Sequence, residues 1–164
     1  MSKQTAQAAI PYATTLRVRD ACLCLHTQRA AHALARRFDA AFRPLNLTNG
    51  QFSLLMSLNR PAPPSQGAVA ALLAMDRTTL TAALKPLAER GLVVITPNPA
   101  DRRNRLLGLT EAGQALLAQA VPIWEREHAE LEATLPLSQP HILRANLATL
   151  SAAPVPVAKL APKR

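Results

Sequence analysis

The sequence is poor in the features that mark membrane-spanning and secreted proteins. Aromatic residues make up only 3% of the 164 residues, so a hydrophobic core has to be built mainly from alanine, leucine and valine, which favours helices. No apolar run reaches the roughly 20 residues that span a bilayer, and the N-terminal stretch lacks the apolar segment of a secretory signal. We therefore expect a cytoplasmic protein with one helical domain.

Cysteine and acidic residues are also scarce. The two cysteines, Cys22 and Cys24, are one residue apart, so a disulfide between them would be strained and a disulfide-stapled secreted fold is not expected. Ten acidic residues stand against nineteen lysines and arginines, a formal charge of +9. This excess suits a polyanionic partner such as nucleic acid. The sequence carries no phosphate-binding loop, zinc-protease motif, nucleophile elbow or dinucleotide fingerprint, which argues against an enzyme, and we expect no cofactor and no metal.

The first half of the chain shows helical periodicity interrupted by proline-rich and capping positions. A long helix is predicted from about 16 to 43, after a loosely held arm at 1–14. Thr48 and Ser65 are typical N-caps of two short helices, and Asp76 is the expected N-cap of a further helix that ends at Gly91. In that helix Pro86 is expected to cause a kink.

After Gly91 the pattern changes from helical to extended. The runs "LVVIT" and "RLLGLT" flank the turn-forming stretch "PNPADRRN", which predicts a β-hairpin. Thr110 then begins a second long helix, bent at Pro122, and a short helix follows at roughly 138–150. The last segment, 151–164, is rich in proline and is expected to be a disordered basic tail.

The order of these elements predicts a helix-turn-helix followed by a basic hairpin. A short helix and a tight turn come before a second helix with a polar face, and in this motif the second helix enters the major groove of DNA. Its exposed residues are short hydroxyl and cationic side chains that suit phosphates and base edges: Arg77, Thr78, Thr79, Thr81 and Lys85.

The hairpin tip collects Arg102, Arg103 and Arg105. A helix in the major groove leaves the neighbouring minor groove unread, and narrow A·T-rich minor grooves concentrate negative potential that attracts arginine. Asp101 is placed to orient one of these arginines. The predicted fold class is mainly α with a small β-hairpin wing (α+β), a winged helix-turn-helix, and the predicted function is binding of double-stranded DNA.

Three stretches of the sequence together resemble the MarR family of winged helix-turn-helix regulators: "LNLTNGQFSLLMSL", "AMDRTTLTAALKPLAERGLV" and "PADRRNRLLGLTEAGQALL". The resemblance implies a cytoplasmic homodimeric repressor on a palindromic operator, with Arg103 in the minor groove, held by Asp101, and with Ser65 and Gln66 among the contact positions. It also implies this organisation: a flexible arm at 1–14, a single domain at 15–150 with dimerisation helices at about 16–43 and 111–150 around a winged helix-turn-helix at about 48–110, and the tail at 151–164.

Two signals could release the protein from its operator: oxidation of a thiol or binding of a ligand. Cys24 lies 24 residues before Thr48, a spacing that resembles the organic-peroxide sensors of the OhrR type, with Cys22 as a second candidate thiol. The tyrosines that surround the thiol in those sensors are absent here, where the matching positions are Gln28, Phe38 and Asn49. The alternative is a small aromatic ligand in a pocket between the dimer helices and the winged domain, with these candidate lining residues: His32, Phe52, Met56 and Trp124.

Two rival functions follow from the same residues. A thiol peroxidase based on Cys24 would turn over hydroperoxide, whereas a histone-like architectural protein would bind DNA without a sequence-specific footprint. A metal site at Cys22, Cys24 and His26 is disfavoured, because side chains at i, i+2 and i+4 spread around one helix.

Overall fold

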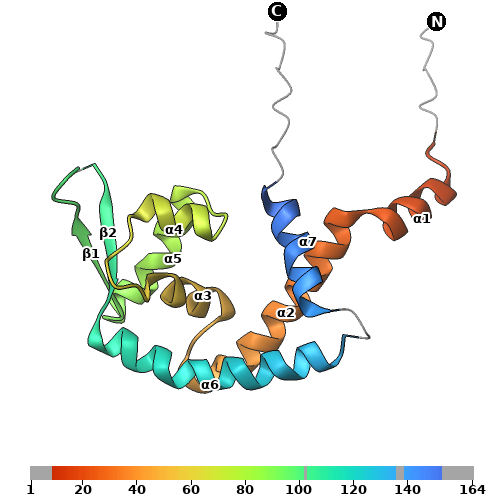
Figure 1. The fold of residues 1–164 in the computed structure, drawn as a ribbon. Coiled ribbons are helices and arrows are strands. Elements are labelled where there is room, and N and C mark those ends of the chain that lie inside the picture. The colour runs from red at the N-terminus through yellow and green to blue at the C-terminus, as the bar shows by residue number, and fades with distance from the viewer. Residues whose placement is uncertain (1–8, 102, 136–138, 153–164) are drawn as a thin grey trace, which may run out of the picture.

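Two groups of helices joined by one long helix make up the protein in the computed structural model, which describes residues 9–101, 103–135 and 139–152 (Figure 1). The elements are α1 (Tyr12–Ala21), α2 (Leu23–Phe42), the 3-10 helix η1 (Arg43–Leu45), α3 (Asn49–Leu58), α4 (Gln66–Leu72), α5 (Arg77–Glu89), β1 (Val93–Pro97), β2 (Arg105–Leu109), α6 (Glu111–Ala133) and α7 (Pro140–Ala152). The helix α6 passes under both groups: α4, α5 and the hairpin lie towards its N-terminal end, and α2 and α7 towards its C-terminal end. The predicted mainly helical fold with a two-stranded wing is confirmed.

The N-terminal region forms two helices, which corrects the expected single helix at 16–43. α1 already begins at Tyr12, inside the segment expected to be a loose arm, and the backbone leaves helical geometry at Cys22 with ψ 105°. The Cys22 thiol accepts a hydrogen bond from the Leu25 N–H at 3.4 Å and so caps α2. The break escaped prediction because neither glycine nor proline marks it, and cysteine is not among the preferred helix caps.

Both chain ends of the expected organisation fall partly beyond the described residues. α7 continues to Ala152, so the segment expected to be a tail at 151–164 begins inside a helix. Residues 1–8 and 153–164 lie outside the described part of the chain.

The buried core lies where α2, α3, α5, β2 and α6 meet. Its aromatic residues stack in series, with ring centroids 5.9 Å apart for Phe38 and Phe42, 4.7 Å for Phe42 and Phe52, and 6.5 Å for Phe52 and Trp124. The predicted cap at Thr48, reinforced by Gln51, starts α3 and brings Phe52 into this stack. Leucine supplies most of the remaining core, as the composition predicts: Leu54, Leu55, Leu80, Leu84, Leu87 and Leu107.

Two prolines lie inside helices without ending them. α5 continues as one helix through Pro86, where a kink was expected. α6 continues through Pro122 as one gently curved helix in Figure 1. Both prolines are exposed, so the carbonyl that each deprives of its helical donor can bond to water instead.

The start of α6 is fixed tightly against the hairpin. The Thr110 hydroxyl accepts from the Gly113 N–H at 3.1 Å and donates to the Gly91 carbonyl at 2.6 Å. A Cβ at Gly113 would lie 2.1 Å from the Leu92 carbonyl oxygen, so only glycine permits this approach. These contacts hold the start of α6 in a fixed position relative to the wing.

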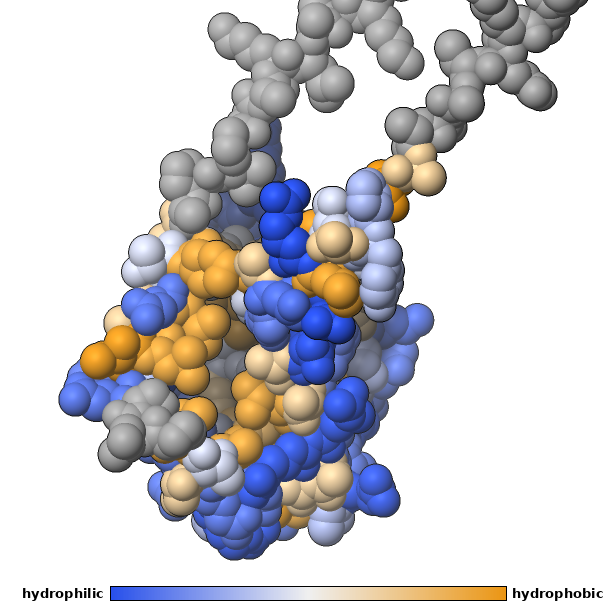
Figure 2. Space-filling model, turned by 90° about the vertical axis from the view of Figure 1, so that its right-hand side faces the viewer, coloured by the Kyte–Doolittle hydropathy of each residue, from blue (hydrophilic) through white to orange (hydrophobic). Residues whose placement is uncertain are grey.

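The outer helices α1 and α7 bury no side chain. α7 exposes a row of large apolar residues: Ile142, Leu143, Leu147 and Leu150. Viewed from this end of the molecule, apolar side chains gather into a broad patch on the surface (Figure 2). An apolar patch of this kind marks an interaction surface.

No single helix among the described residues has the length and hydropathy to cross a bilayer. α4 and α5 meet those criteria only when taken as one segment, and they are bent by 105° relative to one another.

Candidate nucleic-acid interface

α4 and α5 have the geometry of a helix-turn-helix. The Ser65 hydroxyl accepts from the Ala68 N–H at 3.2 Å and begins α4, while an Asp76 carboxylate oxygen accepts from the Thr79 N–H at 2.8 Å and begins α5. Ala74 in the connecting turn has φ +52°, which closes the turn in the left-handed region. The 105° bend between the helices falls within the range of this motif.

The N-terminus of α5 carries a negative charge that its own hydrogen bonds stabilise. Besides the Thr79 N–H, the Thr79 hydroxyl donates to the second Asp76 oxygen at 2.7 Å. These bonds, the backbone one first, hold the pKa of Asp76 below its ordinary value. Thr79 was expected to contact DNA, but its hydroxyl proton serves the cap, so toward a ligand it offers only an acceptor.

Thr81 and Gln66, also expected at the DNA surface, bond to each other. The Thr81 hydroxyl donates to the Arg77 carbonyl at 2.7 Å and accepts from the Gln66 side-chain amide at 2.8 Å. The pair ties α4 to the first turn of α5. Both side chains therefore position the second helix, a role that residue type and spacing did not reveal.

The remaining predicted residues of α5 are free to meet a ligand. Arg77 and Thr78 are exposed on the first turn, opposite the buried Leu80 and Leu84. Lys85 is exposed two turns later and lies 3.9 Å from Glu89, a surface pair with little energetic weight.

The wing is an antiparallel hairpin in the predicted place. β1 pairs with β2 from Val93 opposite Leu109 to Pro97 opposite Arg105. A third segment joins on the other edge of β2: Ser65 forms a bridge with Leu106, and the Leu107 N–H donates to the Pro64 carbonyl at 3.0 Å. This bridge fixes the wing to the start of α4 and was not predicted, because a single bridging residue leaves no alternating pattern.

The wing tip is held by asparagine and aspartate rather than by an ion pair. Asp101 accepts from the Arg103 backbone N–H at 3.0 Å and from the Asn104 side-chain amide at 2.7 Å. Asp101 thus holds Arg103 through its backbone N–H, and no salt bridge to the Arg103 guanidinium occurs among the described residues. Asn98 accepts from the Ala100 N–H at 3.0 Å and tightens the same turn. Arg102 lies outside the described residues.

An open groove of about 890 Å³ lies between α5 and the wing. Three cationic side chains line it, Arg77 and Lys85 from the helix and Arg105 from β2, together with the half-exposed Ile95 of β1. Arg103 is exposed at the tip of the same wing. The helix and the hairpin thus present one continuous, positively charged concave surface.

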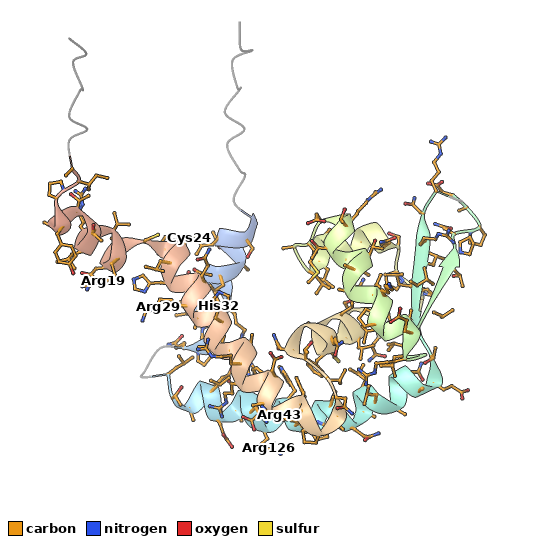
Figure 3. The ribbon with its side chains drawn as sticks, turned by 180° about the vertical axis from the view of Figure 1, so that it is seen from behind. Arg19, Cys24, Arg29, His32, Arg43 and Arg126 are labelled. Atoms are coloured by element: carbon orange, nitrogen blue, oxygen red, sulfur yellow. The ribbon has the colours of Figure 1, made fainter. Side chains whose placement is uncertain are left out.

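The candidate thiols lie far from this groove, at the junction of α1 and α2 (Figure 3). Neither thiol forms a disulfide among the described residues, and Cys24 is exposed in the single chain. The Gln28 side-chain amide lies 3.5 Å from the Cys24 sulfur. No group of three or more His, Cys, Asp or Glu side chains suited to a metal ion occurs in the described ranges.

The four expected pocket residues do not share one cavity. Phe52, Met56 and Trp124 line a cavity of about 420 Å³ between α3, the end of α4 and α6. His32 lies instead on a separate recess along α2. Leu72 and Leu73 complete the cavity from the helix-turn-helix side.

Comparison with known sequences places the central segment in a known family. A sequence profile described as the MarR family matches residues 45–104, from η1 to the wing. Among curated proteins, the transcriptional repressor NicR of Pseudomonas putida is 34% identical over 103 residues, which cover 58% of this chain and 65% of NicR. The match thus spans slightly less than two thirds of that relative's length.

Solved structures match over a larger share of the chain. The transcriptional regulator MosR of M. tuberculosis, solved with DNA, is 36% identical with a TM-score of 0.72, over 79% of this chain and 93% of that one. The repressor CouR, solved on a 23-mer DNA duplex, is 30% identical with a TM-score of 0.73, over 88% and 99% of the two chains. CouR from Rhodococcus jostii RHA1, bound to p-coumaroyl-CoA, matches at 25% identity with a TM-score of 0.71, over 83% and 96%.

Proposed function

Because this chain belongs to the MarR family of transcriptional regulators, we propose that it is a homodimeric repressor that binds a palindromic DNA operator through α5 and the wing. The family consists of regulators and not of enzymes, so a peroxidase activity at Cys24 is not proposed. The site of action would be the cytoplasm, where the operator DNA is.

The observation that carries this proposal is the cationic groove between α5 and the wing. Arg77 and Arg105 line it and Arg103 is exposed at the wing tip, and within the described residues none of these three arginines is paired with a carboxylate. Unpaired guanidinium groups suit both phosphates and guanine edges, and a protruding arginine suits a narrow minor groove. Related chains of the same fold have been solved on DNA.

The homodimer is supported by the outer helices. α1 and α7 bury no side chain within one chain, although both carry apolar residues. A second copy packed against α1 and α7 would remove this surface from water. A two-fold dimer presents two α5 helices and reads half-sites roughly 34–36 Å apart, one turn of DNA.

For the signal, we propose a small aromatic ligand in the cavity lined by Phe52, Met56 and Trp124. A ligand there contacts α3 and α6 and also Leu72 and Leu73 at the end of α4. Its binding would therefore shift the helix-turn-helix relative to the long helix that carries the dimer. CouR, with an aromatic CoA thioester in its structure, supports ligand binding in this fold.

Oxidation of Cys24 in the manner of OhrR-type sensors remains a second proposal for the signal. The exposure of Cys24 favours it, because an accessible thiol can react with a peroxide. Replacement of Cys24 by serine is expected to leave operator binding intact and to abolish its loss on peroxide treatment. Peroxide-induced release that persists in this variant would assign the signal to another group.

Footprinting of the purified protein on the DNA upstream of its own gene tests the proposed function. A repressor gives a bounded, two-fold symmetric footprint that weakens when Arg103 is replaced by alanine. An architectural protein gives protection without defined borders, and that result would overturn the proposal. Titration of aromatic acids into the same complex then identifies ligands that shrink the footprint.

A further inference from the structure

The outward face of α2 carries a row of cationic side chains that the DNA interface does not use. Arg29, Arg36 and Arg43 follow one another at intervals of seven residues, and His26 and His32 lie beside them. Seven residues are close to two helical turns, so the arginines share one side of the helix, about 10 Å apart along its axis. Figure 3 shows Arg29, His32 and Arg43 along the back of the molecule, on the group of helices away from the wing.

The first part of this row surrounds an open recess of about 800 Å³. Its walls are His26, Arg29, His32 and Arg36, and the small side chains of Ala30 and Ala33 form its floor. The His26 ring is fixed at one end, where its Nε2 lies 3.1 Å from the Asp20 carbonyl oxygen. Long cationic walls above an alanine floor leave space for a compact anionic group.

The arginines of the recess have no acidic partner in the protein. All ten acidic residues of the sequence are among the described residues, and none comes within 4.0 Å of Arg29 or Arg36. The neighbouring Arg37 points the other way and bonds to Glu127 at 3.0 Å and to Glu130 at 2.6 Å. The acidic side chains of α6 thus neutralise the inner face of α2 and leave the outer face charged.

We propose that the recess lined by His26, Arg29, His32 and Arg36 binds the phosphate groups of a small-molecule ligand. Guanidinium groups match phosphate oxygens with paired hydrogen bonds, and two arginines approaching from opposite ends suit a diphosphate. The recess runs from His26 to Arg36, about 15 Å along the helix, and Arg43 does not line it. A DNA backbone would be expected to follow the whole row, whereas a small phosphorylated ligand fits inside the recess.

Calorimetric titration of the full chain with inorganic pyrophosphate, at physiological ionic strength, tests this site. The double variant R29Q/R36Q removes the walls of the recess, and R17Q/R43Q is the matched control that removes the same charge elsewhere on exposed positions of α1 and η1. Saturable binding is expected for the unmodified chain and for the control. The recess variant is expected to bind about ten-fold more weakly or worse.

Four results would overturn the proposal. The unmodified chain shows no saturable binding, or both double variants lose affinity equally, which assigns the effect to net charge. If the R29Q/R36Q variant loses more affinity for a DNA duplex without an operator than for pyrophosphate, the row of arginines binds nucleic acid. If the R29Q/R36Q variant sediments differently from the unmodified chain, this face of α2 is a contact between copies of the protein. Operator affinity measured on the same samples reports on α5 and the wing separately.

Discussion

The winged half of the molecule buries a core of large apolar side chains within one chain, whereas the outer helices α1 and α7 bury none. α5 and β2 each bury leucines completely, and Gly113 locks α6 against the hairpin. α1 and α7, of comparable length to α5, bury none. The winged half therefore shares a buried core with α2 and α6 within one chain, whereas the apolar side chains of the outer helices are left for a contact of the kind that the proposed dimer supplies.

The same two regions also differ in how they use charge. Between α2 and α6, Arg37 is paired with Glu127 and Glu130, and the pKa of Glu127 is lowered by the hydrogen bonds from Arg37 first and Arg126 second. In the winged half the carboxylates of Asp76 and Asp101 bond to N–H and hydroxyl groups of their own turns. The groove arginines Arg77 and Arg105 are therefore left without a carboxylate partner, whereas Lys85 lies 3.9 Å from Glu89.

The largest effect is expected from breaking the core of the winged half. Replacing Leu84 by alanine, a fully buried residue of α5, leaves a cavity and should lower the free energy of unfolding by about 2–5 kcal/mol. Urea denaturation monitored by circular dichroism measures this. The matched change Leu150→Ala on exposed α7 should cost far less within one chain; equal losses would contradict the division into two regions.

The next effect concerns the outer helices. Replacing the exposed Leu147 of α7 by aspartate places a charge in the proposed contact between copies and should weaken the dimer by about 3 kcal/mol or more, roughly a hundred-fold. Analytical ultracentrifugation across a concentration series measures the dissociation constant. A dimer of unchanged strength would show that α7 faces water, and Glu111→Gln on α6 provides a surface control.

At the groove, replacing Arg103 by alanine should weaken operator binding by about 1–3 kcal/mol if its guanidinium reads the groove directly. Gel-shift titration on operator and on random DNA measures both the affinity and the preference. Arg17→Ala on α1 is the control for the loss of one charge. Affinity equal to that of the control would remove the wing from the mechanism.

Most of the winged half could be predicted because its signals are local. Thr48, Ser65, Asp76 and Thr110 are helix caps whose side chains bond within three residues, and each one starts a helix at the predicted place. The hairpin follows from two apolar runs around a turn. Such features depend on short-range hydrogen bonds and alternation, which the order of residues displays directly.

The errors in prediction involve interactions that residue order does not display. The helix break at Cys22 depends on a thiol acting as a cap, and the Gln66–Thr81 bond joins residues fifteen positions apart. His32 was expected beside Phe52, Met56 and Trp124, and in the single chain it lines a separate recess on α2 because it faces away from their cavity. The bond of Asp101 to the Asn104 side chain was not predicted, although the Asp-x-x-Asn spacing is a turn signal that indicates it.

A smaller effect on the groove is expected from the residue that positions the tip. Replacing Asn104 by alanine removes its 2.7 Å bond to Asp101 and loosens the turn that presents Arg103, so operator binding should weaken by about 0.5–1.5 kcal/mol. Asn104→Ala combined with Arg103→Ala should cost no more than Arg103→Ala alone, because the asparagine acts only through the arginine. Additive losses in this double-mutant cycle would give Asn104 a contact of its own.

The smallest effect is a pH dependence at the start of α5. Because the hydrogen bonds from Thr79 lower the pKa of Asp76 in the folded protein, the charged cap stabilises the fold above the ordinary pKa of aspartate, about 3.9, and this stabilisation is lost as the pH falls through the lower folded value. The variant Asp76→Asn keeps a capping oxygen but cannot titrate. Denaturation midpoints measured from pH 7 to pH 3 should therefore converge for the unmodified chain and Asp76→Ala, while Asp76→Asn keeps a constant advantage over Asp76→Ala. If the midpoints of the unmodified chain and Asp76→Ala stay parallel over the whole range, the cap does not act through its charge.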